Sequence, residues 1–204
     1  MIYRQLRTAS SKAIIHLFSN SVIQVFVAFA TNIILLRSIS PEIFGSFTIL
    51  VALIGFVFSI LSLRLGIHVI KAGTNEYDEH FKSEMNSVFF LEILIILICS
   101  VLILFFTDYF QFWALVVLLA ILTQHFVDYM KCFFERTMNY KVLAKLETYS
   151  RLLGHGFAIT AIYLYPNNGF EILILRELIS ALCLLICLRL TDGLIKFHLT
   201  LPSI

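Results

Sequence analysis

The sequence predicts an all-α, polytopic membrane protein that folds as a bundle of six transmembrane helices. Of its 204 residues, 60% are hydrophobic and 14% are charged, and the mean hydropathy is +0.94. A soluble domain carries about 25% charged residues, so this chain has too few charges to coat a water-facing globule. Its apolar residues also form long blocks instead of alternating with polar ones, which is the pattern of membrane-spanning helices and not of strands.

Six apolar blocks have the length of about 20 residues that a helix needs to cross the hydrocarbon. Because backbone amides in lipid must be satisfied internally, each block is predicted to be helical. The blocks cover residues 13–36, 47–65, 88–106, 112–130, 146–165 and 170–190, and together they form a single lobe over residues 1–204 with no soluble domain.

The first block follows three cationic residues and resembles a signal peptide, but its apolar run continues to Leu36. It is therefore predicted to be an uncleaved first helix. The second block follows a connection at residues 37–46, in which Pro41 ends the preceding helix and Gly45 permits a tight entry into the next one. A charged stretch at residues 68–86 precedes the third block.

A short loop at residues 107–111 joins the third block to the fourth, and an amphipathic stretch at residues 131–145 leads to the fifth. Residues 166–169 have the sequence Pro-Asn-Asn-Gly, which favours a tight turn before the sixth block. The fifth and sixth blocks are the least apolar, because they contain Glu147, Arg151, His155, Arg176 and Glu177.

The distribution of Lys and Arg predicts the orientation in the membrane. Cationic residues accumulate in cytoplasmic loops. With the N-terminus inside, all of the 15 Lys and Arg residues fall on the cytoplasmic side except Arg37 and Arg176. The protein is therefore expected in the bacterial inner (plasma) membrane, with both termini and both long connections on the cytoplasmic side. The net charge of +2 is too small to be informative about nucleic acid, and no nucleic-acid partner is expected.

Two stretches resemble one family of transporters. Residues 36–47, Leu-Arg-Ser-Ile-Ser-Pro-Glu-Ile-Phe-Gly-Ser-Phe, resemble the LxRxLxPxxFGxF segment of polysaccharide-unit flippases in the multidrug/oligosaccharidyl-lipid/polysaccharide exporter superfamily, and Leu65-Gly66-Ile67 resembles the turn that ends their second helix. The second stretch resembles their entry into helix five and contains Tyr140, Leu143, Ala144, Glu147, Ser150 and Gly154.

The resemblance implies a flippase that moves an undecaprenyl-pyrophosphate-linked oligosaccharide, such as an O-antigen or capsule unit, across the inner membrane. Such proteins have two six-helix lobes around a central cavity, so this chain corresponds to the N-terminal lobe. A homodimer or a second chain would supply the other lobe, unless the chain is a truncated remnant without transport activity. Arg64 departs from the acidic residue that many relatives carry before the Leu-Gly turn.

Polar residues within the apolar blocks are the candidate substrate-cavity residues, because a charge at the bilayer centre costs about 2.5–3.5 kcal/mol on insertion scales. In the first block His16, Asn20, Gln24 and Thr31 share one helix face. That face either bonds neighbouring helices or lines a wet cavity. The remaining candidates are Arg64, Asp128, Arg151 and Arg176.

Each of these candidates has alternative interpretations. Arg64 either extends to the headgroups or attracts the substrate pyrophosphate, and Asp128 either pairs with Lys131 or takes up a proton. Arg176 pairs near Glu177, extends outward or faces the cavity. Glu147, Arg151 and His155 follow one another at i, i+4 steps. Ser150, Gly154 and Ala158 form a row of small residues that favours close helix packing.

The sequence contains no HExxH, phosphate-binding glycine loop or GxSxG, and the four cysteines lack metal-ligand spacing. We therefore expect no enzyme activity, metal or cofactor. A non-transporting membrane scaffold for envelope polysaccharide synthesis enzymes is the alternative function, and a membrane glycosyltransferase or polymerase is a third. The expected partners are membrane lipid and a lipid-linked oligosaccharide.

Overall fold

The computed structural model describes residues 2–73, 77–107, 111–137 and 140–191, with side chains from residue 18 onward. Within these ranges every regular element is an α-helix, as the sequence predicts. The helices are α1 (Ile2–Ser38), α2 (Pro41–Leu61), α3 (Leu65–Lys71), α4 (Glu79–Phe106), α5 (Phe112–Arg136), α6 (Tyr140–Leu164) and α7 (Gly169–Thr191).

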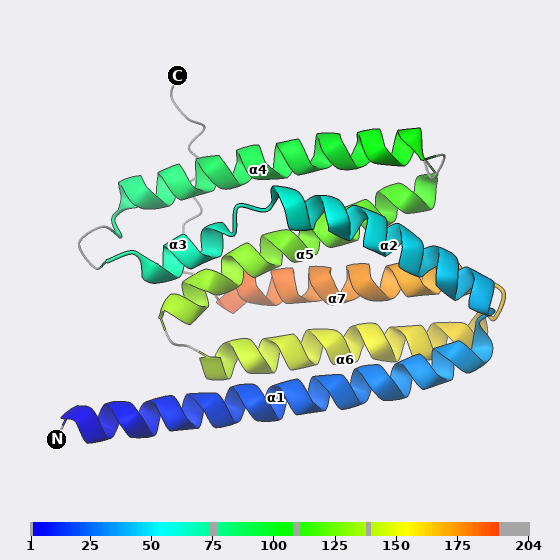
Figure 1. Ribbon diagram of the computed structural model, residues 1–204. Helices are drawn as coiled ribbons and strands as arrows, with labels where there is room; N and C mark the ends of the chain where they lie inside the picture. Colours follow the sequence, from blue (N-terminus) through cyan, green and yellow to red (C-terminus); the bar gives the residue numbers. More distant parts are fainter. Residues whose placement is uncertain (1, 74–76, 108–110, 138–139, 192–204) are drawn as a thin grey trace.

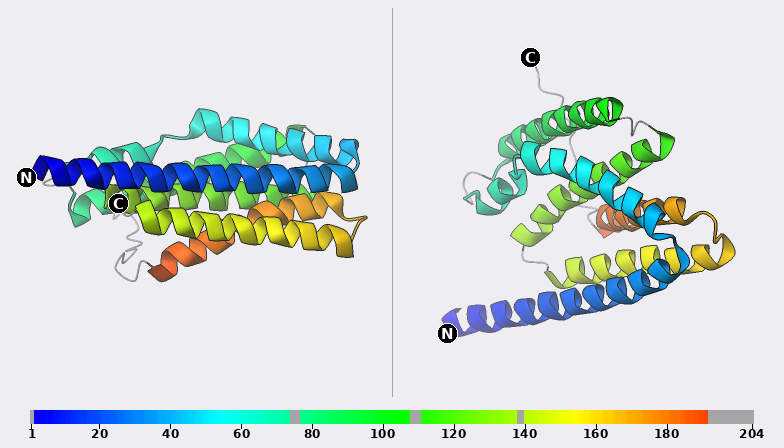
Figure 2. Two further views of the ribbon diagram at one scale, coloured as in Figure 1. Left: turned by 90° about the horizontal axis from the view of Figure 1, so that it is seen from below. Right: turned by 45° about the vertical axis from the view of Figure 1, so that its right-hand side comes forward.

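The long helices form two groups with α5 between them. Helix α6 packs against both α1 and α7, while α2 packs against α4 (Figure 1). Helix α5 runs obliquely between the groups and contacts α7 on one side and the short α3 on the other (Figure 2). This arrangement places the polar residues of α5 next to those of α6 and α7.

The connection between α1 and α2 is much shorter than the predicted loop at residues 37–46. Only Ile39 and Ser40 separate the two helices, and Pro41 is the first residue of α2. The Ser40 side chain accepts a hydrogen bond from the backbone N–H of Ile43 and so caps the new helix. The prediction that Pro41 belongs to a loop is therefore wrong, because proline at the first helical position has no N–H that needs a partner.

The predicted second helix ends early. Helix α2 stops at Leu61, and Leu65 begins the separate helix α3. Arg64 lies in the left-handed region with φ 51° and ψ 41°, which interrupts a right-handed helix. The predicted end at residue 65 is wrong, and Leu65-Gly66-Ile67 starts a helix instead of ending one.

Both predicted long connections are largely helical. The Asp78 side chain accepts a hydrogen bond from the N–H of Phe81 and so caps α4. Helix α4 therefore begins at Glu79, nine residues before the start of the predicted apolar block at residue 88. Helix α5 extends to Arg136, and α6 begins at Tyr140. The predicted loops at residues 68–86 and 131–145 are wrong because charged, amphipathic sequence extends helices beyond the hydrocarbon as readily as it forms loops.

Apolar side chains cover the exterior as well as the core. Leu35, Ile54 and Leu173 are fully buried where the two groups meet. Phe26 and Phe106, however, are 71% and 80% exposed, which is typical of a surface that meets lipid. In the described residues four helices are long and apolar enough to cross a membrane, namely α1 from Phe18 onward, α2, α4 and α5. These findings indicate a membrane protein.

Candidate functional site

A polar cavity of about 340 Å³ lies among α1, α5, α6 and α7. It is lined by residues from all four helices, most of them polar or charged: Ala28, Asn32, Gln124, Lys131, Glu147, Ser150, Arg151, His155, Arg176, Glu177, Ser180 and Leu184. Four charged residues within α6 and α7 line this cavity. Their place in its wall explains why charged residues occur within these two apolar helices.

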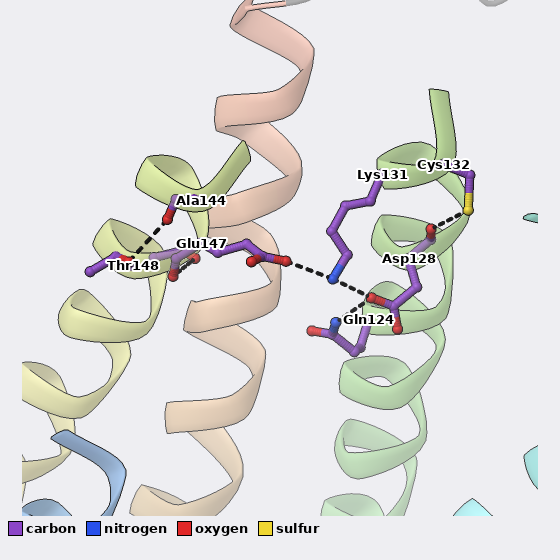
Figure 3. Close-up of polar contacts among 8 residues, drawn as sticks. Gln124, Asp128, Lys131, Cys132, Ala144, Glu147 and Thr148 are labelled. Carbon is purple, nitrogen blue, oxygen red and sulfur yellow. Dashed lines mark hydrogen bonds and ion pairs between the residues drawn. The ribbon is translucent and has the colours of Figure 1, made fainter. Parts of the chain in front are cut away.

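Lys131 links α5 to α6 across this cavity (Figure 3). Its ammonium nitrogen lies 2.9 Å from Glu147 Oε1 on α6 and 2.8 Å from Asp128 Oδ1 on α5. Gln124 Nε2 donates to the same Asp128 oxygen at 3.0 Å. The predicted Asp128–Lys131 ion pair is confirmed, and Glu147 is paired with Lys131 on a neighbouring helix.

Arg176 forms a second polar group on the α7 side of the cavity. Its guanidinium donates to Asn32 Oδ1 on α1 at 3.0 Å, and its Nε donates to Glu177 Oε1 at 3.0 Å. The Arg176 side chain is 11% exposed. Two of the three alternatives for Arg176 are therefore both correct, because the side chain pairs with Glu177 and also faces the cavity. The third alternative is wrong, since the side chain does not extend outward to the headgroups.

Arg151 and His155 lie on α6 between these two groups. Arg151 lines the cavity and makes no ion pair or hydrogen bond with another residue in the described part of the chain. His155 is 8% exposed, and its Nδ1 has no partner there. The cavity therefore offers one unneutralised guanidinium to a ligand, while the unpaired imidazole nitrogen beside it is buried.

An apolar cavity of about 380 Å³ adjoins the polar one. Its walls include Phe47 and Val51 from α2 and Val117 from α5. The two cavities share three wall residues, Gln124, Arg176 and Glu177. A ligand with a polar and an apolar part could therefore contact both cavities at once.

The predicted polar face of α1 is only partly described. His16 lies outside the described side chains. Asn20 is 8% exposed and its Oδ1 accepts a hydrogen bond from Thr148 on α6, so it bridges two helices. Thr31 is fully buried, while the Nε2 atom of Gln24 is buried and has no partner among the described side chains. It is the neighbouring Asn32 that lines the polar cavity.

Arg64 does not join Arg151 and Arg176. It lines a third cavity, of about 410 Å³, at the break between α2 and α3. Asp128 also lines this third cavity, although its carboxylate is bonded to Gln124 and Lys131 of the polar cavity. The structure thus separates Arg64 from Arg151 and Arg176, and it adds Glu92 and His125 to the third cavity.

The small-residue row on α6 packs as predicted. Ser150, Gly154 and Ala158 are all buried, and a Cβ atom on Gly154 would lie 2.8 Å from the carbonyl oxygen of Arg176 on α7. Close packing there also positions Arg151 and His155 beside α7.

The other two motif glycines differ from each other. A Cβ on Gly66 would collide with the Cys132 sulfur on α5, so a side chain at this position would push α3 away from α5. At Gly45 nothing lies within 4 Å of such an atom. Gly45 is inside α2 and does not have a positive φ, so neither space nor backbone conformation requires glycine there.

Sequence reasoning did not single out Asn32 and His125, and it noted Glu92 as an ionisable residue of the third block without assigning it a role. Asn32 falls off the helix face defined by Asn20 and Gln24, and Glu92 and His125 are 33 positions apart on different helices. Their polarity within apolar blocks was the available indication, but it does not reveal which residues meet.

Comparison with known proteins identifies the family. A family model described as polysaccharide biosynthesis protein matches residues 34–197. No curated protein and no solved structure matches the chain. The matched segment includes α2 to α7 and every residue of the polar cavity except Ala28 and Asn32. The chain belongs to the polysaccharide biosynthesis protein family.

Proposed function

We propose that this protein moves undecaprenyl-pyrophosphate-linked oligosaccharide units across the bacterial inner membrane for surface polysaccharide biosynthesis, including O-antigen or capsule. It acts as a flippase and not as an enzyme. In this proposal α6 and α7 also span the membrane, which gives six transmembrane helices with both termini in the cytoplasm.

The observation that carries the proposal is the contact between the polar and apolar cavities at Gln124, Arg176 and Glu177. A lipid-linked oligosaccharide is itself half polar and half apolar. Its sugar and phosphate groups fit the cavity that contains Arg151, and the first part of its isoprenoid chain fits the cavity walled by Val51. A water-soluble sugar would use only the polar cavity, and a plain phospholipid has no glycan hydroxyls to bond with the amides and carboxylates there.

The polar cavity has the mixed chemistry that a glycan needs. Sugar hydroxyls both donate and accept hydrogen bonds, and the cavity provides carboxylates, amides and hydroxyls as well as cations. Lys131 and Arg176 are already neutralised by carboxylates. Arg151 is the described cavity cation that remains available for a phosphate, to which a guanidinium binds through two parallel hydrogen bonds.

Transport needs the cavity to open alternately to the two sides of the membrane. A second lobe, supplied by another copy or another chain, would complete the walls of the cavity. Rocking of two lobes about the cavity would then move the polar head while the isoprenoid chain remains in lipid.

The direct test is translocation in proteoliposomes. A fluorescent polyprenyl-pyrophosphate oligosaccharide is placed in both leaflets, and a membrane-impermeant quencher reports the rate at which the inner pool becomes accessible. We expect Arg151→Glu to reduce the protein-dependent rate about 10-fold or more, because it replaces the available cation with an anion facing the phosphate.

Lys145→Glu is the matched control. It makes the same charge change on the same helix, but Lys145 is exposed and lies about one and two-thirds turns before Arg151, so it does not line the cavity. Its rate should equal that of the wild type. Equal rates for both variants would contradict the proposed site. If the wild-type protein gives no translocation while cells lose surface polysaccharide without it, the scaffold function is favoured instead.

A further inference from the structure

The third cavity contains a buried carboxylate that the proposed transport site does not use. Glu92 lies on α4, where its side chain is 2% exposed. Its Oε1 accepts a hydrogen bond from the backbone N–H of Leu63 at 3.0 Å, in the break between α2 and α3. Its Oε2 is buried and has no partner in the described part of the chain. Glu92 thus ties α4 to the end of α2 with only one of its two oxygens.

His125 on α5 is the one basic side chain beside this carboxylate among the described residues. Its Nε2 lies 3.2 Å from Glu92 Oε1, but the atoms do not meet hydrogen-bond geometry, and Nε2 is left without a partner. A small rotation of the ring would complete the bond. The imidazole is held between Phe58 of α2 and Phe89 of α4, each with its ring centroid 5.4 Å away.

This environment makes a charged carboxylate costly without a proton or a cation nearby. The aromatic rings exclude water from one side, and charges in such surroundings interact much more strongly than in bulk water. Ionisable side chains inside membrane-spanning helices usually have a role in proton or ion binding. Here Glu92 Oε2 and His125 Nε2 are both buried without a hydrogen-bond partner in the described part of the chain.

We propose that Glu92 and His125 form a proton-binding site that controls how firmly the α2–α3 break is attached to α4. A proton from water binds to the carboxylate and is released again to water, so no other reactant is needed. With Glu92 ionised, its bond to the Leu63 N–H is charge-assisted and strong. With Glu92 protonated, the same bond is about half as strong, and the break can move relative to α4.

The surrounding groups are compatible with a site that exchanges protons. The cavity opens past the exposed residues Arg64 and Asp128. The other titratable groups that line it are Tyr129, Cys132 and Glu135, all on α5. The Tyr129 hydroxyl donates to Asn86 and not to Glu92. Among the lining residues from the end of α2 through α3, Arg64 is the one charged side chain.

Infrared difference spectroscopy of the whole protein in lipid nanodiscs tests the proton site. The spectra are compared across about pH 4 to pH 9, where Glu and His side chains titrate in proteins. We expect a protonated-carboxyl C=O band that appears as the pH decreases. Glu92→Gln should remove the component of this band that belongs to Glu92. Asp128→Asn, which changes a half-exposed carboxylate in the same cavity, should retain it.

Hydrogen exchange at the Leu63 amide tests the mechanical consequence, with each rate divided by the intrinsic rate at that pH. Protection in the wild type should decrease about 3- to 10-fold on protonation. Glu92→Gln keeps an acceptor for the Leu63 N–H but cannot titrate, so its protection should be independent of pH. Glu92→Leu should be poorly protected at every pH.

Three results would overturn the proposal. The first is a wild-type spectrum with no titrating carboxyl band, and the second is a titrating band that is the same in the wild type and in Glu92→Gln. The third is loss of the band when NaCl is added at constant pH, which would make the occupant a metal cation and not a proton. None of these readouts depends on transport, so they are independent of the proposed substrate.

Discussion

Replacing Lys131 by methionine should separate α5 from α6. The Lys131 side chain is 19% exposed and that of its partner Glu147 is 22% exposed. Removing the ammonium leaves the Glu147 carboxylate four-fifths buried, and no other described group is bonded to it. Asp128 is less affected, because it is 51% exposed and retains its bond from Gln124.

The expected loss in the free energy of unfolding is about 2–3 kcal/mol. Breaking a fully buried pair costs about 3–5 kcal/mol, and partial exposure reduces that value. Glu147→Gln alone should cost only about 1 kcal/mol, since Lys131 keeps its bond to Asp128. The double variant Lys131→Met/Glu147→Gln should then cost less than the sum of the single variants, with a coupling energy of about 1–2 kcal/mol.

Unfolding of the four proteins in mixed micelles measures this coupling. Trp113 is the single tryptophan of the chain, and it packs against the core on α5, so its fluorescence reports the transition. Glu79→Gln is the matched control, because the exposed Lys82–Glu79 pair joins neighbouring turns of one helix and should contribute at most about 0.5 kcal/mol. A coupling energy below about 0.5 kcal/mol for Lys131 and Glu147 would refute the reasoning.

Two further predictions concern helix packing. Gly154→Ala should lower the free energy of unfolding by about 1–3 kcal/mol, because the new methyl group would approach the carbonyl oxygen of Arg176. Gly156→Ala is the control and should be neutral or stabilising, because its methyl group would meet nothing within 4 Å. Equal effects of the two substitutions in denaturation experiments would contradict this account. Arg136 donates to the carbonyl oxygens at the end of α3, including Ala72 at 2.7 Å. Arg136→Gln should therefore increase hydrogen exchange of α3 by about 10-fold or more, and unchanged exchange would show that these bonds do not hold α3.

The sequence was sufficient to predict the helical class because long apolar blocks leave few alternatives. Each of the six predicted segments lies largely within one long helix. Of the six predicted spans, the four that correspond to α1, α2, α4 and α5 are long and apolar enough in the described residues to cross a membrane, whereas α6 and α7 carry charges within their apolar stretches. Those charges belong to the polar cavity, which only the packing of four helices reveals.

The missed features depend on tertiary contacts. Arg64 adopts a left-handed conformation that few non-glycine residues prefer, and nothing in its immediate sequence demands it. Glu147 was expected to share a helix face with Arg151, yet it pairs with Lys131 on α5. Local spacing identifies which residues could interact, but it cannot choose between a partner on the same helix and one on a neighbour.

Binding of a lipid-linked oligosaccharide tests the central claim most directly. We predict that a polyprenyl-pyrophosphate oligosaccharide binds the purified protein at least about 10-fold more tightly than either the free oligosaccharide or the polyprenyl phosphate alone, because only the complete ligand contacts both cavities. Ala120→Trp, which fills the apolar cavity beside Val117, should reduce this difference, and Arg151→Glu should do the same from the polar side. Equal affinity for the complete ligand and for either fragment, or no effect of both substitutions, would contradict the account.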